Sequence, residues 1–174
     1  DSDCFYNNKN DWAVVHACKD PCHKAAVGYR GNLPKNHPNY LIYENGNHLF
    51  LNMVDMNMPL SHEFTKPIVT TALKFMENHI ATKNILVHCN LGQSRSPALV
   101  MLYLAKRQKS IRNSSFEDAK EDFIKVFPNC QFGSGIGTYL ATTHDMVDTL
   151  RFLFDKRIES KSDIINKRRC NYLI

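Results

Sequence analysis

The sequence lacks the features that mark membrane-spanning and secreted proteins. It contains no run of about 18 apolar residues, which argues against a membrane span. Its first residues, Asp1-Ser2-Asp3, have neither the positive region nor the apolar region of a signal peptide. It also contains no internal repeat. The length of 174 residues suits one domain that can bury a core.

The cysteines and the net charge indicate which ligands and which cellular compartment to expect. No second pair of ligands follows Cys18, Cys22 and His23 at the spacing of a structural zinc site, so we expect no metal. The net charge of +5 favours anionic ligands without requiring a nucleic acid. Scattered cysteines fit a reducing compartment, so we expect a cytoplasmic location, with the nucleus as the alternative.

The most informative stretch is residues 85–107, where a strand, a short loop and a helix follow one another. Ile85-Leu86-Val87 is typical of a buried strand. A polar loop runs from Cys89 to Arg95, and an apolar helix with Pro97 in its first turn follows. Loop N–H groups and the positive end of the helix dipole converge in such an arrangement. The stretch therefore predicts an anion site.

Both ends of this loop carry reactive chemistry. Amide groups and a nearby cation can lower the pKa of a thiol by several units from about 8.5, so Cys89 is a candidate thiolate nucleophile. The planar fork of Arg95 matches two phosphate oxygens in a way that a lysine does not. We expect His88 to orient the loop through hydrogen bonds. The Ser96 hydroxyl is placed to donate to the sulfur when it leaves.

The segment His88-Cys89-Asn90-Leu91-Gly92-Gln93-Ser94-Arg95-Ser96 matches the HCxxGxxRS signature and resembles cysteine-dependent protein phosphatases of the dual-specificity branch. The resemblance extends over residues 48–155 and is weak before them. It implies an α/β fold of the protein tyrosine phosphatase type, with a twisted mixed sheet of four to five strands flanked by helices. It also implies a single phosphatase catalytic domain over 1–174, with 1–11 and 158–174 peripheral.

The resemblance also assigns roles to the site residues. It implies that Cys89 attacks phosphorus and that Arg95 and Ser96 assist it. Asp55 falls at the distance before the cysteine where this family has its general acid, with Asp20 a distant second candidate. The phosphate-binding set is Asn90, Leu91, Gly92, Gln93, Ser94 and Arg95. No metal or cofactor takes part in this chemistry.

The function implied is hydrolysis of phosphotyrosine and phosphoserine or phosphothreonine in proteins through a cysteinyl-phosphate. Phosphoinositides are an alternative, but the loop contains no lysine for a polyphosphorylated headgroup. RNA 5′ phosphates are another, but no basic groove with stacking aromatics is evident. Two further alternatives are a catalytically inactive module that only binds phosphate, and sulfur transfer on a rhodanese-type cysteine loop. The residues around Cys89 favour neither of them.

The remaining pattern places the other elements. We expect strands near 13–17, 40–43, 48–54 and 85–88, with Asn45-Gly46 in a hairpin turn. A helix is predicted to begin after a Ser61 cap, with the helix proper from about Lys66 because Pro67 comes late for a helix start. Further helices are predicted after a Ser114 or Ser115 cap and over 138–156. Lys106 is expected in a solvated basic end of the helix after the loop.

Overall fold

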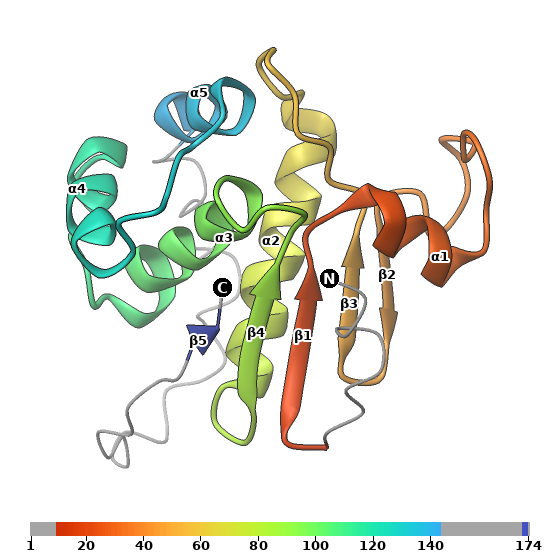
Figure 1. Cartoon of the computed structure of the whole chain (residues 1–174), viewed down its shortest axis with the longest axis horizontal. Helices are drawn as coiled ribbons and strands as arrows, with labels where there is room; N and C mark the ends of the chain where they lie inside the picture. Colours follow the sequence, from red (N-terminus) through yellow and green to blue (C-terminus); the bar gives the residue numbers. More distant parts are fainter. Residues whose placement is uncertain (1–9, 144–171, 174) are drawn as a thin grey trace, which may run out of the picture.

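The computed structural model describes residues 10–143 and 172–173, and a mixed five-stranded sheet organises them. The strands lie in the order β2-β3-β1-β4-β5 (Figure 1). β1 is parallel to β3 and β4, β4 is parallel to β5, and β2 is antiparallel to β3. Their bounds are β1 Trp12–His16, β2 Ile42–Asn45, β3 His48–Leu51, β4 Asn84–His88 and β5 Tyr172–Leu173. The expected fold class is confirmed.

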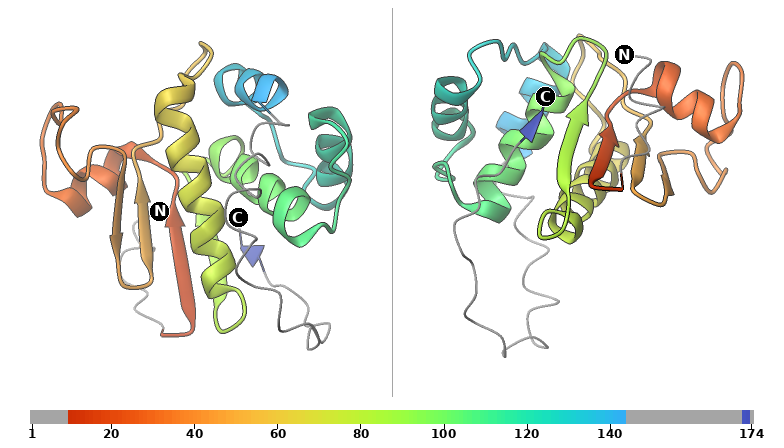
Figure 2. Two further views of the ribbon diagram at one scale, coloured as in Figure 1. Left: turned by 180° about the vertical axis from the view of Figure 1, so that it is seen from behind. Right: turned by 60° about the horizontal axis from the view of Figure 1, so that its bottom comes forward.

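Helices cover the sheet, and the long helix α2 runs across one face of it (Figure 2). Helix α3 follows β4 directly and packs beside α2, while α4 and α5 lie further out beyond the β4 side of the sheet. The helices are α1 Lys24–Val27, α2 His62–His79, α3 Arg95–Tyr103, α4 Phe116–Val126 and α5 Ser134–Thr143, with the short π-helical segment η3 Leu104–Gln108. The segment η2 Lys19–His23 is kinked, because Asp20 within it is extended. None of the helices in these ranges has the length and apolar character needed to cross a bilayer.

The core lies where α2 and α3 meet the sheet. Every residue of α3 is buried, which explains why the sequence after the loop is apolar on all sides. Helix α2 contributes an apolar stripe that includes Ile68, Leu73 and Met76. Truncation of a fully buried leucine such as Leu99 costs about 2–5 kcal/mol in comparable cores. This burial fixes the direction in which the first turn of α3 points.

The hairpin forms as expected, but its boundaries differ. Asn45 pairs with His48, so the turn consists of Gly46 and Asn47, and Gly46 has the positive φ of +57° that such a turn requires. Strand β3 ends at Leu51, so the prediction of a strand to residue 54 is wrong. Residues 52–60 instead form a protruding loop, which we call the Asp55 loop.

Three helix predictions also need correction. Helix α2 begins at His62 and contains Pro67. The missing N–H there leaves only the exposed Glu63 carbonyl without a helical partner, and water can satisfy it. Helix α5 begins at Ser134 rather than 138, and the predicted part after residue 143 lies outside the described residues. Lys106 is buried rather than solvated. The Ser115 cap is confirmed, since its hydroxyl accepts a hydrogen bond from the Asp118 amide.

Strands β1, β3 and β4 all end at the same edge of the sheet (Figure 1). Three segments leave from that edge: residues 17–23, the Asp55 loop and the loop between Cys89 and Ser94. The carboxyl ends of parallel strands are where open α/β sheets bind ligands. Residues far apart in sequence meet here.

Candidate active site

The loop from Cys89 to Arg95, which we call the phosphate loop, presents N–H groups that bond to no backbone carbonyl among the described residues. Gly92 has a φ of +70°, a conformation that a glycine adopts without strain. In the described part of the chain, no backbone carbonyl accepts a hydrogen bond from the N–H groups of Asn90 to Ser94. The first turn of α3 adds further N–H groups, because Ser94 makes no side-chain cap. The loop is therefore built to hold an anion.

Cys89 lies at the base of this loop, next to Ser96. The Ser96 hydroxyl donates a hydrogen bond to the Cys89 sulfur over 3.2 Å. Burial raises the pKa of the Cys89 thiol, but hydrogen bonds from Ser96 and the Gly92 backbone, together with the charge of Arg95, outweigh it and lower that pKa below its usual value. The structure brings these predicted residues together around a sulfur that favours the thiolate.

The Arg95 guanidinium is buried and only partly used. Its Nη1 donates to the Met53 carbonyl at 3.0 Å, and its Nη2 donates to the Asn90 side chain at 2.8 Å. Its buried Nε makes no hydrogen bond, although the Asp55 carboxylate lies 3.5 Å away. A buried N–H without an acceptor is costly, so a ligand oxygen placed there would gain a strong charge-assisted hydrogen bond.

Asp55 is held beside Arg95 by a segment before α5 whose contacts with the Asp55 loop were not predicted from sequence. The Gly133 amide donates to the Ser94 hydroxyl at 2.9 Å, and the Gln131 amide donates to the Gln93 carbonyl at 2.8 Å. Two further bonds reach the Asp55 loop, because Gly135 N–H and the Ser134 hydroxyl each donate over 3.0 Å, to the carbonyls of Met56 and Asn57. Residues 131–135 therefore connect the phosphate loop to the Asp55 loop, and we call them the bridging segment.

The close approach at Gly135 leaves no space for a side chain. A Cβ atom there would lie 2.3 Å from the Met56 carbonyl oxygen and 2.7 Å from that of Met58, both of which are backbone atoms. At Gly133, a Cβ would lie 3.1 Å from the Asp55 carboxylate. Gly137 is different, since its Cβ would have ordinary van der Waals room, 3.5 Å from Phe132. The glycine at 135 thus sets the position of the Asp55 loop.

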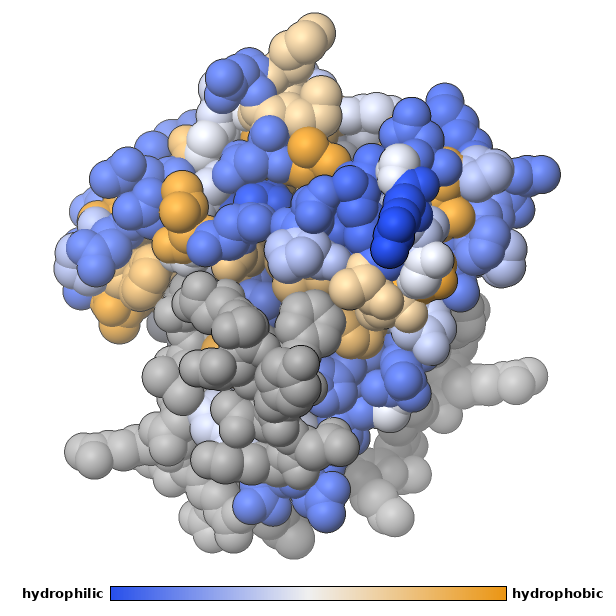
Figure 3. All heavy atoms as spheres, turned by 45° about the vertical axis from the view of Figure 1, so that its right-hand side comes forward, coloured by the Kyte–Doolittle hydropathy of each residue, from blue (hydrophilic) through white to orange (hydrophobic). Residues whose placement is uncertain are grey.

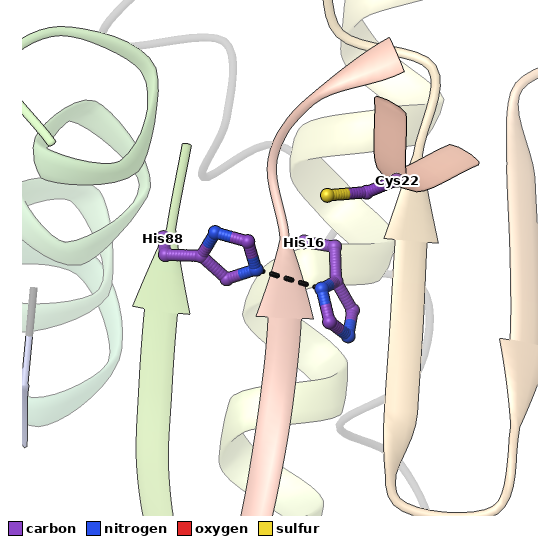
Figure 4. A group of neighbouring side chains, drawn as sticks. All are labelled: His16, Cys22 and His88. Atoms are coloured by element: carbon purple, nitrogen blue, oxygen red, sulfur yellow. Dashed lines mark hydrogen bonds between the residues drawn. The ribbon is translucent and has the colours of Figure 1, made fainter. Parts of the chain in front are cut away.

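His88 is fixed from behind by a chain of imidazoles. Its Nε2 lies 2.7 Å from Nδ1 of His16, and Nε2 of His16 lies 3.0 Å from Nδ1 of His48. Figure 4 shows His88 and His16 facing each other from adjacent strands. Burial lowers the pKa of His16 to about 2, with His88 and His48 adding to the effect, and burial also lowers the pKa values of His88 and His48. The neutral rings are therefore held in one orientation.

One group of side chains in the described ranges resembles a metal site in its composition. One ligand atom from each of His16, Cys22 and His88 lies within 4.8 Å of the other two (Figure 4). These are ligand types that suit zinc. The grouping differs from the one considered in the sequence, because His23 contacts Tyr29 instead. The facing nitrogen atoms of His16 and His88 already bond each other, which gives both rings a role without a metal.

The segment after β1 forms another wall of the site. The Lys19 amide donates to the Met53 carbonyl at 2.9 Å, and the Asn90 side chain donates to the Asp20 carbonyl at 2.9 Å. The Asp20 carboxylate pairs with Lys24, whereas the Asp55 carboxylate lies beside Arg95. Of the two acid candidates, the geometry favours Asp55. The exposed side chains of Leu91 and Gln93 lie at the rim.

Sequence reasoning missed His16, Gly135 and Lys19. His16 stands opposite His88 in the pairing of β1 with β4, so correct strand pairing would have found it. Gly135 and Lys19 depend on long-range packing that no local pattern encodes.

Comparison with known proteins agrees with this geometry. The family described as dual specificity phosphatase, catalytic domain, matches residues 13–141, so the similarity begins well before residue 48. The structure of DUSP15 is 16% identical with a TM-score of 0.55, over 91% of this chain and 85% of that one. The structure of PTPMT1 in complex with PI(5)P is 19% identical, with a TM-score of 0.52 and 82% of each chain covered. PTP-2 phosphatase of Cydia pomonella is 19% identical, with a TM-score of 0.51 over 80% and 76%. At these identities the structures establish the fold.

Selective alkylation tests the state of the Cys89 thiol. At pH 6, iodoacetate should modify Cys89 much faster than Cys130, because burial raises the pKa of Cys130 to about 11 while the pKa of Cys89 is lowered. Peptide mass mapping over time measures both rates. Ser96→Ala should slow the reaction of Cys89, since it removes a hydrogen bond to the sulfur. Equal rates at Cys89 and Cys130 would contradict the assignment.

The buried histidines predict a loss of stability in mild acid. Burial lowers the pKa of His16 to about 2 and that of His23 to about 4, whereas both titrate near 6.5 when unfolded. The unfolded chain therefore binds protons that the native chain does not bind, so the free energy of unfolding decreases as the pH drops below 6.5. Each group should cost about 2 kcal/mol at pH 5.

Urea unfolding at pH 7 and pH 5 measures this loss. A His16→Gln variant lacks one of these buried histidines, so it should lose less stability between these pH values than the original chain. Identical losses in both proteins would show that His16 does not titrate as described.

Proposed function

Because this chain belongs to the dual specificity phosphatase catalytic-domain family, we propose that it hydrolyses phosphotyrosine and phosphoserine or phosphothreonine in proteins through a cysteinyl-phosphate. One observation carries the proposal. Among the described residues, the buried Arg95 Nε–H has no hydrogen-bond acceptor, and the Asp55 carboxylate lies 3.5 Å from it. A phosphoryl oxygen is the acceptor that this arrangement fits.

In the first step, the Cys89 thiolate attacks phosphorus in line with the ester oxygen. A sulfur–phosphorus bond forms and the phosphorus–oxygen bond of the ester breaks. Arg95 and the N–H groups from Asn90 to Ser94 hold the other phosphoryl oxygens as charge develops on them. Protonated Asp55 gives its proton to the departing oxygen, a contribution of about 10²–10⁴ in rate.

In the second step, water breaks the sulfur–phosphorus bond. The Asp55 carboxylate takes a proton from the attacking water, which returns Asp55 to its acid form. The electron pair of the broken bond goes to the Cys89 sulfur. The Ser96 hydroxyl, 3.2 Å from that sulfur, stabilises it as a leaving group by donating a hydrogen bond. Free phosphate then leaves.

A protein substrate is favoured over a phosphoinositide by the composition of the phosphate loop. Arg95 is its only cation, and much of its donor capacity is used on Met53 and Asn90. A headgroup with several phosphates would need further charges nearby. A similar fold does occur in a complex with PI(5)P in PTPMT1, so the lipid remains the second candidate and is included in the test.

Turnover of simple aryl phosphates tests the chemistry. The protein should hydrolyse p-nitrophenyl phosphate in the presence of a chelator, and vanadate should inhibit it. Cys89→Ser should abolish turnover, but the variant should still bind phosphate. Asp55→Asn should reduce the rate on phenyl phosphate by about 10²–10⁴, and much less on p-nitrophenyl phosphate, whose leaving group needs less protonation.

Near-full activity in Cys89→Ser would exclude the cysteinyl-phosphate route. Equal losses on both aryl phosphates would exclude Asp55 as the acid. Rates on phosphotyrosine peptides, phosphoserine peptides, inositol lipids and a triphosphate-ended RNA then rank the substrate classes, and a dominant rate on lipid or RNA would overturn the protein assignment.

The bridging segment gives a prediction with a matched control. Gly135→Ala should lower kcat on phenyl phosphate at least tenfold, because its methyl group would force the Met56 backbone and hence Asp55 out of place. Gly137→Ala, in the same helix, has room for its methyl group and should keep its rate. Steady-state kinetics with both aryl phosphates measures the effect, and unchanged kcat in Gly135→Ala would contradict it.

A further inference from the structure

A cavity of about 340 Å³ lies beside the candidate active site and has no role in the chemistry described above. Its walls come from the segment before β2, from the Asp55 loop and from the start of α2. The side chains that line it are mainly apolar and include Tyr40, Leu41, Met53, Leu60 and Phe64, with Lys19 among them. This size lies at the lower end of ligand pockets, with room for about one or two large side chains.

The cavity and the phosphate loop share a wall. The Met53 carbonyl accepts hydrogen bonds from both the Lys19 amide and the Arg95 guanidinium, while the Met53 side chain lines the cavity. Val54 and Met56, on either side of Asp55, also line it. The cavity therefore lies next to the place where Arg95 would hold a phosphate.

Exposed apolar side chains gather around the same place. Of the five large apolar side chains that the described residues expose, three belong to the Asp55 loop and one to the phosphate loop: Val54, Met56, Met58 and Leu91. Figure 3 shows apolar colouring at the tip of a protruding loop and just beneath it, on an otherwise largely polar face. Exposed apolar groups in one place mark a contact surface, and methionine adapts to different partners.

Lys19 adds a charge to this surface. It is half-buried, and none of the ion pairs among the described residues involves its ammonium group. Its backbone amide donates to the Met53 carbonyl, and Lys19 is one of the residues that line the cavity. A cation with no ion-pair partner in the described part of the chain, beside an apolar cavity, fits a ligand that carries an apolar group and a negative charge close together.

We propose that this cavity is a specificity site that binds an apolar side chain close to the phosphorylated residue of a protein substrate, while Lys19 pairs with an acidic residue of the same segment. The inference rests on the proposed function and adds its sequence preference. A peptide fits better than a lipid, because the cavity has room for a side chain rather than a long acyl chain. An acidic residue of the peptide would also supply a negative partner for the Lys19 ammonium group.

The test compares closely matched phosphotyrosine peptides. One series places leucine or alanine at successive positions around the phosphotyrosine, and a second places glutamate or glutamine there. The measured quantity is the ratio of kcat/KM values for the two members of a pair, so a general loss of activity cancels. At the best position, leucine should exceed alanine about tenfold or more, and glutamate should exceed glutamine.

Two variants separate the two contacts. Leu41→Trp fills the cavity and should reduce the leucine preference to less than about twofold, and Lys19→Gln should remove the glutamate preference alone. Val126→Trp, on exposed α4, and Lys74→Gln, on the outer side of α2, are matched controls that should keep both preferences. If Leu41→Trp does not fold, Lys19→Gln still tests the charged contact.

Each other outcome overturns the inference. Ratios near one at every position, with normal hydrolysis of p-nitrophenyl phosphate, would exclude the specificity site and leave the proposed function intact. Preferences that survive in both variants would place the contacts elsewhere. Faster turnover of long-chain than short-chain inositol lipids, lost in Leu41→Trp, would assign the cavity to an acyl chain. No turnover of any substrate would exclude the proposed function as well.

Discussion

The structure depends on the burial of α3 directly behind the phosphate loop. All nine residues of this helix are buried, so its first turn cannot change direction without disrupting the core. Its N-terminus, the hydroxyl of Ser96 and the guanidinium of Arg95 are therefore held in fixed positions around the Cys89 sulfur. The cost of burying a thiolate is offset by these fixed dipoles and by one charge, which need no reorganisation when phosphate arrives.

The phosphate loop was predictable from sequence because its parts are local. Strand, loop and helix follow one another within residues 85–107, and the contact of Cys89 with Ser96 follows from that spacing. The position of Asp55 was inferred from family resemblance, and the structure places it 3.5 Å from Arg95. Its catalytic role stays a prediction. Four strands of the mixed sheet were predictable from sequence, apart from their boundaries, whereas β5, which pairs with β4, was not predicted.

What could not be predicted depends on tertiary packing. Pro67 lies inside α2 because the one carbonyl that it leaves unpaired belongs to an exposed residue, a fact that a propensity scale does not contain. Lys106 is buried although its neighbours suggested a solvated helix end. Nothing in the local sequence distinguishes Gly135 from other helical residues. A side chain is excluded there because the Met56 carbonyl, 79 residues earlier in the chain, lies too close.

The bridging segment has a mechanical consequence for the catalytic cycle. The Asp55 loop is bonded to the first turn of α5 through Gly135 and Ser134, so the loop cannot swing open while that turn stays in place. Any hinge motion that releases phosphate must either break both bonds or carry the start of α5 with it. In the second case α5 moves together with the Asp55 loop. Contacts that restrain α5 would then also lower the rate of phosphate release.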